Sequence, residues 1–168
     1  MILICYDGSE DAKAAVKHVG QLLPGAAATV VTVWDPFSKF SPGGRSRICP
    51  LATIVDADEA NEKLRAEAQE LAGEGVELAN SIGLEAEPAT IERGGSIADA
   101  ILRAAEQLDA DPIVLGSHGT GEIASVLLGS VSHQVLQRAD RMVLVVPSPE
   151  VAVRRHKLLR HETEGATA

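Results

Sequence analysis

The sequence PIVLGSHGTGEIASVLLGSVSHQVL, which spans residues 112–136, contains the pattern on which both the fold and the function depend. It opens with an apolar run typical of a buried strand and continues through a glycine-punctuated stretch at 116–130. The residues that follow have the spacing of a helix that opens at a serine cap. Small residues let backbone N–H groups approach an anion, and the helix dipole adds to the attraction. We therefore predict that residues 116–130 bind phosphate.

The composition is typical of an α/β protein. The chain has 168 residues, of which 45% are hydrophobic but only 2% are aromatic, so the core must consist of Val, Ile, Leu and Ala. The net charge of −9 argues against nucleic acid as a partner, because binding to the phosphate backbone depends on clustered Lys and Arg. No stretch has the length of a membrane span or the pattern of a signal peptide. We expect a cytoplasmic protein with no membrane partner.

Strand and helix patterns alternate along the whole chain. This alternation requires right-handed crossovers and a parallel sheet. We predict a single doubly wound α/β domain at 1–149 with a five-stranded sheet and helices on both faces, followed by a frayed or disordered tail at 150–168. The expected strands cover residues 1–6, 28–34, 85–91, 112–115 and 142–146, and the expected helices cover 10–23, 56–81, 97–108 and 131–136.

Residues 35–55 separate the second expected strand from the second expected helix. They contain prolines and paired glycines and show no sustained periodicity. A loop of this length in a compact domain is usually functional or mobile, so it could be a lid over the strand ends. A surface insertion without such a role is an equal alternative.

Histidine and cysteine positions give no catalytic pattern. Cys5 and Cys49 lack metal-ligand spacing, and Cys5 falls in a strand pattern, where a buried apolar role is expected. His118 and His133 have no Cys, Asp or second His at ligand or triad spacing, so we expect them to face solvent or phosphate. No Lys completes a Walker A motif, and Ala124 interrupts the Rossmann glycine pattern. We predict no catalytic residue and no metal ligand.

The predicted topology brings two loops to one crevice. In doubly wound sheets, ligands lie outside the carboxyl ends of the strands, where the strand order reverses. For the order 3-2-1-4-5, the turn Asp7-Gly8-Ser9 would face residues 116–130. Each residue there also has a structural interpretation, as a turn former or a helix cap. By residue type, Asp7 would bind ribose hydroxyls or a metal-bound water, and Val33 would offer backbone groups to a purine. Gly116 and Gly119 would let the loop turn, and Gly129 would let the ligand approach the start of the helix. Ser130 and Ser132 would contact phosphate.

The spacing Gly116-x2-Gly119-x9-Gly129-Ser130, beside a first strand that ends in Asp7-Gly8-Ser9-Glu10, resembles the universal stress protein family. The apolar run at 143–147 is similar to the last strand of that family. The resemblance implies a Rossmann-like, adenine nucleotide alpha hydrolase-like fold and a homodimer through residues 142–146. In the branch that carries this glycine pattern, it also implies ATP binding, for which we expect Mg²⁺ to accompany the nucleotide.

The resemblance also assigns roles to individual residues. Two features depart from the family: Glu122 adds negative charge to the loop, and no Lys or Arg lies within 116–130. Mg²⁺ or a partner subunit would then supply the positive charge. By the resemblance, Asp7 and Val33 hold ribose and adenine, Leu115 packs near the nucleoside, and Gly116, Gly119, Gly129, Ser130, Val131 and Ser132 surround the phosphates.

These observations favour an ATP-binding regulatory protein of the stress response. Burial of a purine face of about 150–200 Å² contributes about 4–5 kcal/mol before the entropy of association is subtracted, which predicts micromolar affinity. Hydrolysis should be slow or absent, because phosphoryl transfer needs cationic stabilisation that the loop does not provide. Two alternatives remain: an enzyme of a related nucleotide-binding class, such as a nucleotidyl transferase or an electron-transfer flavoprotein-like chain, and an interaction module that binds no nucleotide.

Overall fold

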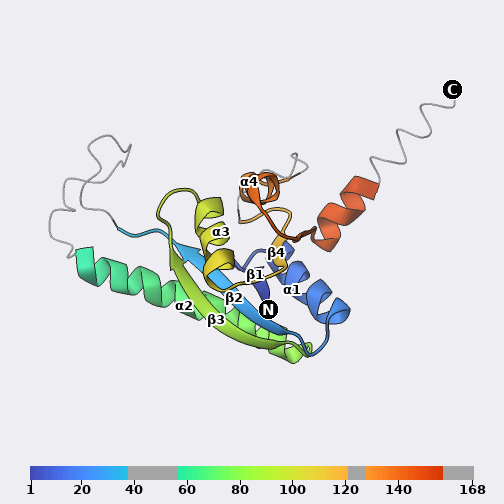
Figure 1. Cartoon of the computed structure of the whole chain (residues 1–168), viewed down its shortest axis with the longest axis horizontal. Coiled ribbons are helices and arrows are strands. Elements are labelled where there is room, and N and C mark those ends of the chain that lie inside the picture. Colours follow the sequence, from blue (N-terminus) through green and yellow to red (C-terminus); the bar gives the residue numbers. More distant parts are fainter. Residues whose placement is uncertain (38–56, 121–127, 157–168) are drawn as a thin grey trace, which may run out of the picture.

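A computed structural model describes residues 1–37, 57–120 and 128–156 of the chain (Figure 1). Strands and helices alternate from the N-terminus, as the sequence predicts. A final helix, which we call the C-terminal helix, covers residues 149–156. The remaining elements are β1 (Ile2–Cys5), α1 (Glu10–Leu22), β2 (Ala27–Trp34), α2 (Ala57–Ser81), β3 (Glu85–Glu92), α3 (Ile97–Gln107), β4 (Ile113–Gly116), α4 (Ser130–Arg138) and β5 (Val143–Val146).

The strands form one parallel sheet with the order β3-β2-β1-β4-β5, which confirms the predicted topology. Ile4 of β1 is in register with Val30 of β2 on one side and with Val114 of β4 on the other. The strand order therefore reverses between β1 and β4. Ligands of doubly wound sheets bind at such a reversal, so a ligand site is expected at the carboxyl ends of these two strands.

Helices cover both faces of the sheet, with α2 on one side and α3 on the other in Figure 1. Successive residues of β1 point to opposite faces, because the side chains of a strand alternate. Ile4 packs with α1 and α2 residues such as Val16, whereas Leu3 packs with α3 and α4 residues such as Ile101 and Val135. Both clusters consist almost entirely of aliphatic side chains, as the low aromatic content predicts.

Helix α2 approaches the sheet closely at Gly75. A Cβ atom at this position would lie 2.8 Å from Val30 Cγ1 and 2.9 Å from Tyr6 Cγ, which is too close for a side chain. The Tyr6 hydroxyl donates a hydrogen bond of 2.7 Å to Glu74 Oε1 of the same helix. Burial and the Glu74 carboxylate raise the pKa of Tyr6. The glycine and the buried tyrosine together fix the position of α2, which packs over β2 and β3.

The edge strand β3 covers the expected residues 85–91 and extends to Glu92. It pairs with β2 along all of its eight residues, with Val30 opposite Pro88. The order of the sheet leaves β3 with a neighbour on one side only. A proline is tolerated there because its missing N–H costs no ladder hydrogen bond on the open side.

Two features of the chain differ from expectation. Helix α4 begins at Ser130 with Gly129 as its N-cap, so the prediction of a serine cap is wrong. The C-terminal helix occupies a segment in which the sequence pattern predicts no element. The possible lid at 35–55 lies almost wholly outside the described residues, as do Cys49, Glu122 and residues 157–168. Within the described ranges, no helix is both long enough and apolar enough to cross a membrane.

Candidate functional site

The turn after β1 and the loop after β4 meet at the predicted crevice. A Cβ atom on Gly119 would lie 2.6 Å from Asp7 Oδ2, so the carboxylate rests against the glycine backbone. Ser9 Oγ donates to the carbonyl of His118 at 3.4 Å, and Ser9 N donates to Asp7 Oδ1 at 3.1 Å. Asp7 and Gly119 are both exposed. The first wall of the site is therefore a carboxylate that is held in place yet accessible to a ligand.

The start of α4 lies beside the same loop. Gly129 N donates to the carbonyl of Ser117 at 2.8 Å, and Ser132 Oγ donates to that carbonyl at 3.0 Å. Gly129 has extended backbone angles and forms no side-chain cap. Ser130, the first residue of the helix, is exposed. An N-terminus without a side-chain cap has unsatisfied backbone donors, which suits it to an anionic ligand.

An apolar surface connects the ends of the strands beneath these two walls. Leu115 is buried, and Val33 and Val131 are half-buried members of the cluster on the α3 and α4 face. Cys5 belongs to the same cluster, and burial together with the Asp7 charge raises its thiol pKa to about 12. Aliphatic side chains at this place can cover one face of a planar ring, while Asp7 remains free to bind polar groups.

Three of the predicted site residues, Gly116, Gly129 and Ser132, make packing contacts or hydrogen bonds within the protein. A Cβ on Gly116 would lie 2.7 Å from the carbonyl carbon of Asp11, so this glycine permits close packing of α1. The corresponding atom on Gly129 would lie 3.1 Å from the Ser117 carbonyl oxygen. The buried Ser132 hydroxyl donates to the carbonyls of Ser117 and Gly129. It therefore holds the loop in place, and its proton is already used within the protein.

Behind the loop lies a buried polar cluster that the sequence did not predict. Asp11 is only 5% exposed, and its Oδ2 accepts hydrogen bonds from Ser117 Oγ at 2.6 Å and from His118 N at 2.9 Å. His118 Nδ1 lies 3.0 Å from Ser117 Oγ and 3.4 Å from Asp11 Oδ2. The side chain of His118 is only 13% exposed, so the expectation that it faces solvent is wrong, whereas the phosphate-facing alternative stays a prediction. His133 is exposed, as expected.

The cluster has the composition of a catalytic triad without its geometry. In a triad, the carboxylate and the hydroxyl bind different nitrogens of the imidazole. Here Asp11 and Ser117 both lie near His118 Nδ1, and the Ser117 hydroxyl is fully buried and donates directly to Asp11. The arrangement therefore holds the backbone of the loop and does not activate a nucleophile.

The Asp11 carboxylate is stabilised in its charged form. Burial alone raises its pKa, but hydrogen bonds from Ser117, from Ser148 and from the His118 backbone lower the pKa by more, so the net shift is downward. Sequence periodicity offers one signal for this position, because Asp11 precedes Ala15 and Val19 by four and eight residues on the buried stripe of α1. An acid on the buried stripe of a helix needs a polar partner.

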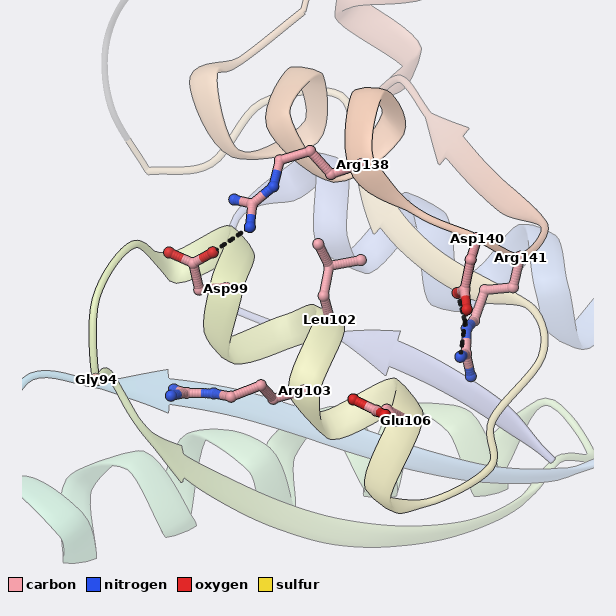
Figure 2. Close-up of a pocket in the computed structure, with 8 residues that line it drawn as sticks. All are labelled: Gly94, Asp99, Leu102, Arg103, Glu106, Arg138, Asp140 and Arg141. Atoms are coloured by element: carbon pink, nitrogen blue, oxygen red, sulfur yellow. Dashed lines mark hydrogen bonds and ion pairs between the residues drawn. The ribbon is translucent and has the colours of Figure 1, made fainter.

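A separate pocket of about 520 Å³ lies over α3 and α4 and contains none of the predicted site residues (Figure 2). Figure 2 shows Arg138 of α4 pointing to Asp99 of α3, with which it forms an ion pair. Arg141 Nη1 donates to the carbonyls of Ala105 and Ala110 at 2.9 and 3.0 Å. These bonds join α3 to the segment before β5, so the pocket residues brace that side of the sheet.

Within residues 1–37, 57–120 and 128–156, no three His, Cys, Asp or Glu side chains are placed to hold a metal ion.

Comparison with known proteins gives consistent matches over most of the chain. The model of the universal stress protein family matches residues 1–147. The chain is 35% identical over 153 residues to a universal stress protein of Thermus aquaticus, and this alignment covers 86% of the chain and 96% of that protein. The structure superposes on hypothetical protein MJ0577 with a TM-score of 0.67 and 27% identity, over 87% of the chain and 94% of MJ0577.

Another similar structure is a universal stress protein in complex with cAMP, with a TM-score of 0.61 and 25% identity. The alignment covers 88% of the chain and 96% of that protein. Sequence, topology and the glycine loop thus agree, and the chain belongs to the universal stress protein family.

Proposed function

We propose that this protein binds ATP in the crevice between Asp7 and the start of α4 and acts as a nucleotide-dependent regulator in the stress response. The contact between the Asp7 carboxylate and the Gly119 backbone carries the proposal, because it brings a ribose-binding group beside the glycine loop. The relative in complex with cAMP supports an adenine nucleotide as the class of ligand.

The nucleoside would occupy the ends of β1, β2 and β4. Asp7 would accept hydrogen bonds from the ribose hydroxyls, and the backbone of Val33 would meet the adenine edge. Leu115 and the half-buried Val33 and Val131 side chains belong to one apolar cluster, which can cover the ring. The proposed site would thus combine apolar contact area with a small number of polar groups, as nucleotide sites usually do.

The phosphates would lie at the start of α4. Gly116 and Gly119 let the loop lie close to α1 and to Asp7. The backbone N–H groups of Ser130, Val131 and Ser132 lie in the first turn of a helix whose cap is a glycine. Mg²⁺ bound to the phosphates would supply positive charge that residues 116–130 lack in their sequence. The same lack of Lys and Arg leads us to expect slow or absent hydrolysis.

Calorimetric titration tests this function directly. We expect Mg-ATP to bind with micromolar affinity and ADP to compete with it. Titration with cAMP is the second arm, because a relative is known in complex with that nucleotide. If cAMP gives heat and Mg-ATP gives none, cAMP replaces ATP as the proposed ligand. If neither nucleotide gives heat, the proposed function is wrong. Steady product formation from ATP, or a flavin in the purified protein, would instead favour the enzyme alternatives.

We also propose that two copies pair through β5 in the cytoplasm. Strand β5 lies at an edge of the sheet, and Met142 beside it is 62% exposed. An apolar edge strand of this kind can pair with a second copy. Sedimentation should give a dimer, and Met142→Asp should weaken it, with Tm falling only by the stabilisation that the dimer provides. A wild-type monomer at micromolar concentration would contradict the pairing.

A further inference from the structure

The C-terminal helix (149–156) follows directly after residues 1–147, which match the family model. It nevertheless contacts Ser117, in the loop after β4. Arg155 Nη2 donates to Ser117 Oγ at 3.5 Å. At the start of the helix, the carbonyl of Ser148 accepts from Ala152 N at 2.9 Å, and its hydroxyl accepts from Val151 N at 3.4 Å. In Figure 1 this helix is the orange-red ribbon that follows the last strand. Its first turn is therefore capped by Ser148, and its last turn is tied to the loop after β4.

A single carboxylate joins this helix to the loop. Asp11 accepts hydrogen bonds from Ser117 and from the His118 backbone on the loop side. On the other side, the hydroxyl and backbone N–H of Ser148 contribute to the lowered pKa of Asp11. Ser117 is fully buried, and Asp11 and Ser148 are 5% and 4% exposed. Because water cannot easily replace these bonds, a shift of one partner must be accompanied by a shift of the others.

The same loop residues hold both walls of the proposed site. The carbonyl of Ser117 accepts from Gly129 N and from Ser132 Oγ, which fix the start of α4. The carbonyl of His118 accepts from Ser9 Oγ, which follows the Asp7 turn. A continuous set of hydrogen bonds therefore runs from the C-terminal helix through Asp11 to both sides of the crevice.

We propose that Asp11 is a positioning residue that couples docking of the C-terminal helix to nucleotide binding, so that each favours the other. The inference rests on the proposed function, because it concerns the affinity of the same crevice. Coupling between two sites is reciprocal, so a helix that strengthens nucleotide binding must itself be stabilised by the nucleotide to the same extent. A partner or modification that displaced the helix would then release nucleotide without entering the crevice.

Two variants test the coupling at the helix and leave Asp11 intact. Arg155→Met removes the bond to Ser117, and Ser148→Ala removes one hydroxyl from the Asp11 carboxylate. Arg154→Met is the matched control, because it removes the same charge from an exposed position that lines a surface pocket with Pro149 and Val153. Each protein is titrated with Mg-ATP and with cAMP, and hydrogen exchange is measured in the peptide 149–156 with and without nucleotide.

In the wild type, we expect nucleotide to slow exchange in the C-terminal helix. Arg155→Met and Ser148→Ala should weaken binding by about three- to tenfold, near the lower end of allosteric couplings, and should remove the nucleotide-dependent protection. Arg154→Met should retain both, and Arg155→Lys should restore part of the affinity. A purely structural role would lower Tm in the variants and leave the affinity and the effect of nucleotide on exchange unchanged.

The outcomes separate the two proposals. Wild type that binds nucleotide, with both variants equally tight and no protection of the helix, overturns the coupling and leaves the function standing. Wild type that binds neither nucleotide overturns both. If Ser148→Ala fails to fold, Arg155→Met decides alone, because its side chain lies on a half-exposed helix surface.

Discussion

The Asp7 carboxylate and the backbone of Gly119 are in contact across the crevice, although the two residues come from opposite ends of the domain. A Cβ on Gly119 would lie 2.6 Å from Asp7 Oδ2 but 3.8 Å from Asp7 Cγ. The conflict is thus with the mobile end of a side chain, whereas a Cβ on Gly116 would meet backbone atoms of Asp11 and Ala12 at 2.7 and 2.8 Å. The two glycines should therefore respond to substitution in different ways.

Gly119→Ala should displace the Asp7 carboxylate and leave the fold intact. Loss of charge-assisted hydrogen bonds to the ribose would weaken nucleotide binding by about ten- to a hundredfold, with little change in Tm. Gly116→Ala is the contrasting variant, because the clash with α1 should destabilise the domain by about 1–3 kcal/mol. Calorimetric titration and thermal unfolding measure the two effects. Unchanged affinity in Gly119→Ala would remove Asp7 from the proposed site.

Gly75→Ala should destabilise the domain by about 1–3 kcal/mol, because the added methyl group meets Val30 and the ring of Tyr6 within 3.0 Å. Gly73→Ala is a matched control in the same helix, since a Cβ there meets nothing within 4 Å. Alanine is the better helix former, so the control should be neutral or more stable by up to about 1 kcal/mol. Urea unfolding distinguishes them, and equal effects of the two variants would contradict the close packing of α2.

Asp11→Asn should lower stability at neutral pH by about 1–3 kcal/mol, because it weakens a buried set of hydrogen bonds to a charged acceptor. Folding lowers the Asp11 pKa from its ordinary value of 3.8, so its contribution is fully present above that pH. The contribution is lost as the pH falls through the lower pKa of the folded state. The wild type and the variant should therefore differ most at neutral pH and converge in strong acid. A difference that stayed constant down to pH 2 would contradict a charged Asp11.

Cys5 should react very slowly with thiol reagents in the folded protein. With a pKa of about 12, only about one thiol in 10⁴ is ionised at pH 8. The measurement uses Cys49→Ser, so that Cys5 is the one remaining cysteine. Labelling should be fast in urea and slow in buffer, and bound nucleotide should slow it further because Cys5 belongs to the apolar cluster of the crevice. Cys5 is partly buried, so complete labelling in buffer within minutes would contradict its raised pKa.

Much of the fold could be predicted because its signals are local. The expected strand at 28–34 is the β-branched run of β2, and the expected helix at 97–108 is α3, which begins with a capping box in which Ser96 and Asp99 bond reciprocally. The strand order needed only the rules for parallel sheets and the position of the glycine loop. The approach of Asp7 to Gly119 then followed from topology.

The missed features depend on contacts between distant segments. Asp11 and Ser117 are 106 residues apart, so their hydrogen bond exists only once β1 and β4 are adjacent. Serine is the stronger capping residue, so the sequence favours a serine cap for α4. In the structure, Gly129 occupies the cap position and forms no side-chain hydrogen bond there. The nearby Ser132 hydroxyl donates to the Ser117 carbonyl instead. A helix as short as 149–156 is unstable alone and is held by contacts such as that of Arg155.

The edge strand β3 has a consequence for assembly. Its exposed residues include Glu85, Glu87 and Glu92, together with Pro88, which offers no N–H to a neighbour. Two such edges would bring like charges together and lack a donor, so this side of the sheet resists extension. Pairing of copies through β5 would then occupy the other edge of the sheet, so that neither edge could pair with a further copy. If copies pair through β5 as proposed, the sheet would form a closed pair and would not extend into a fibre.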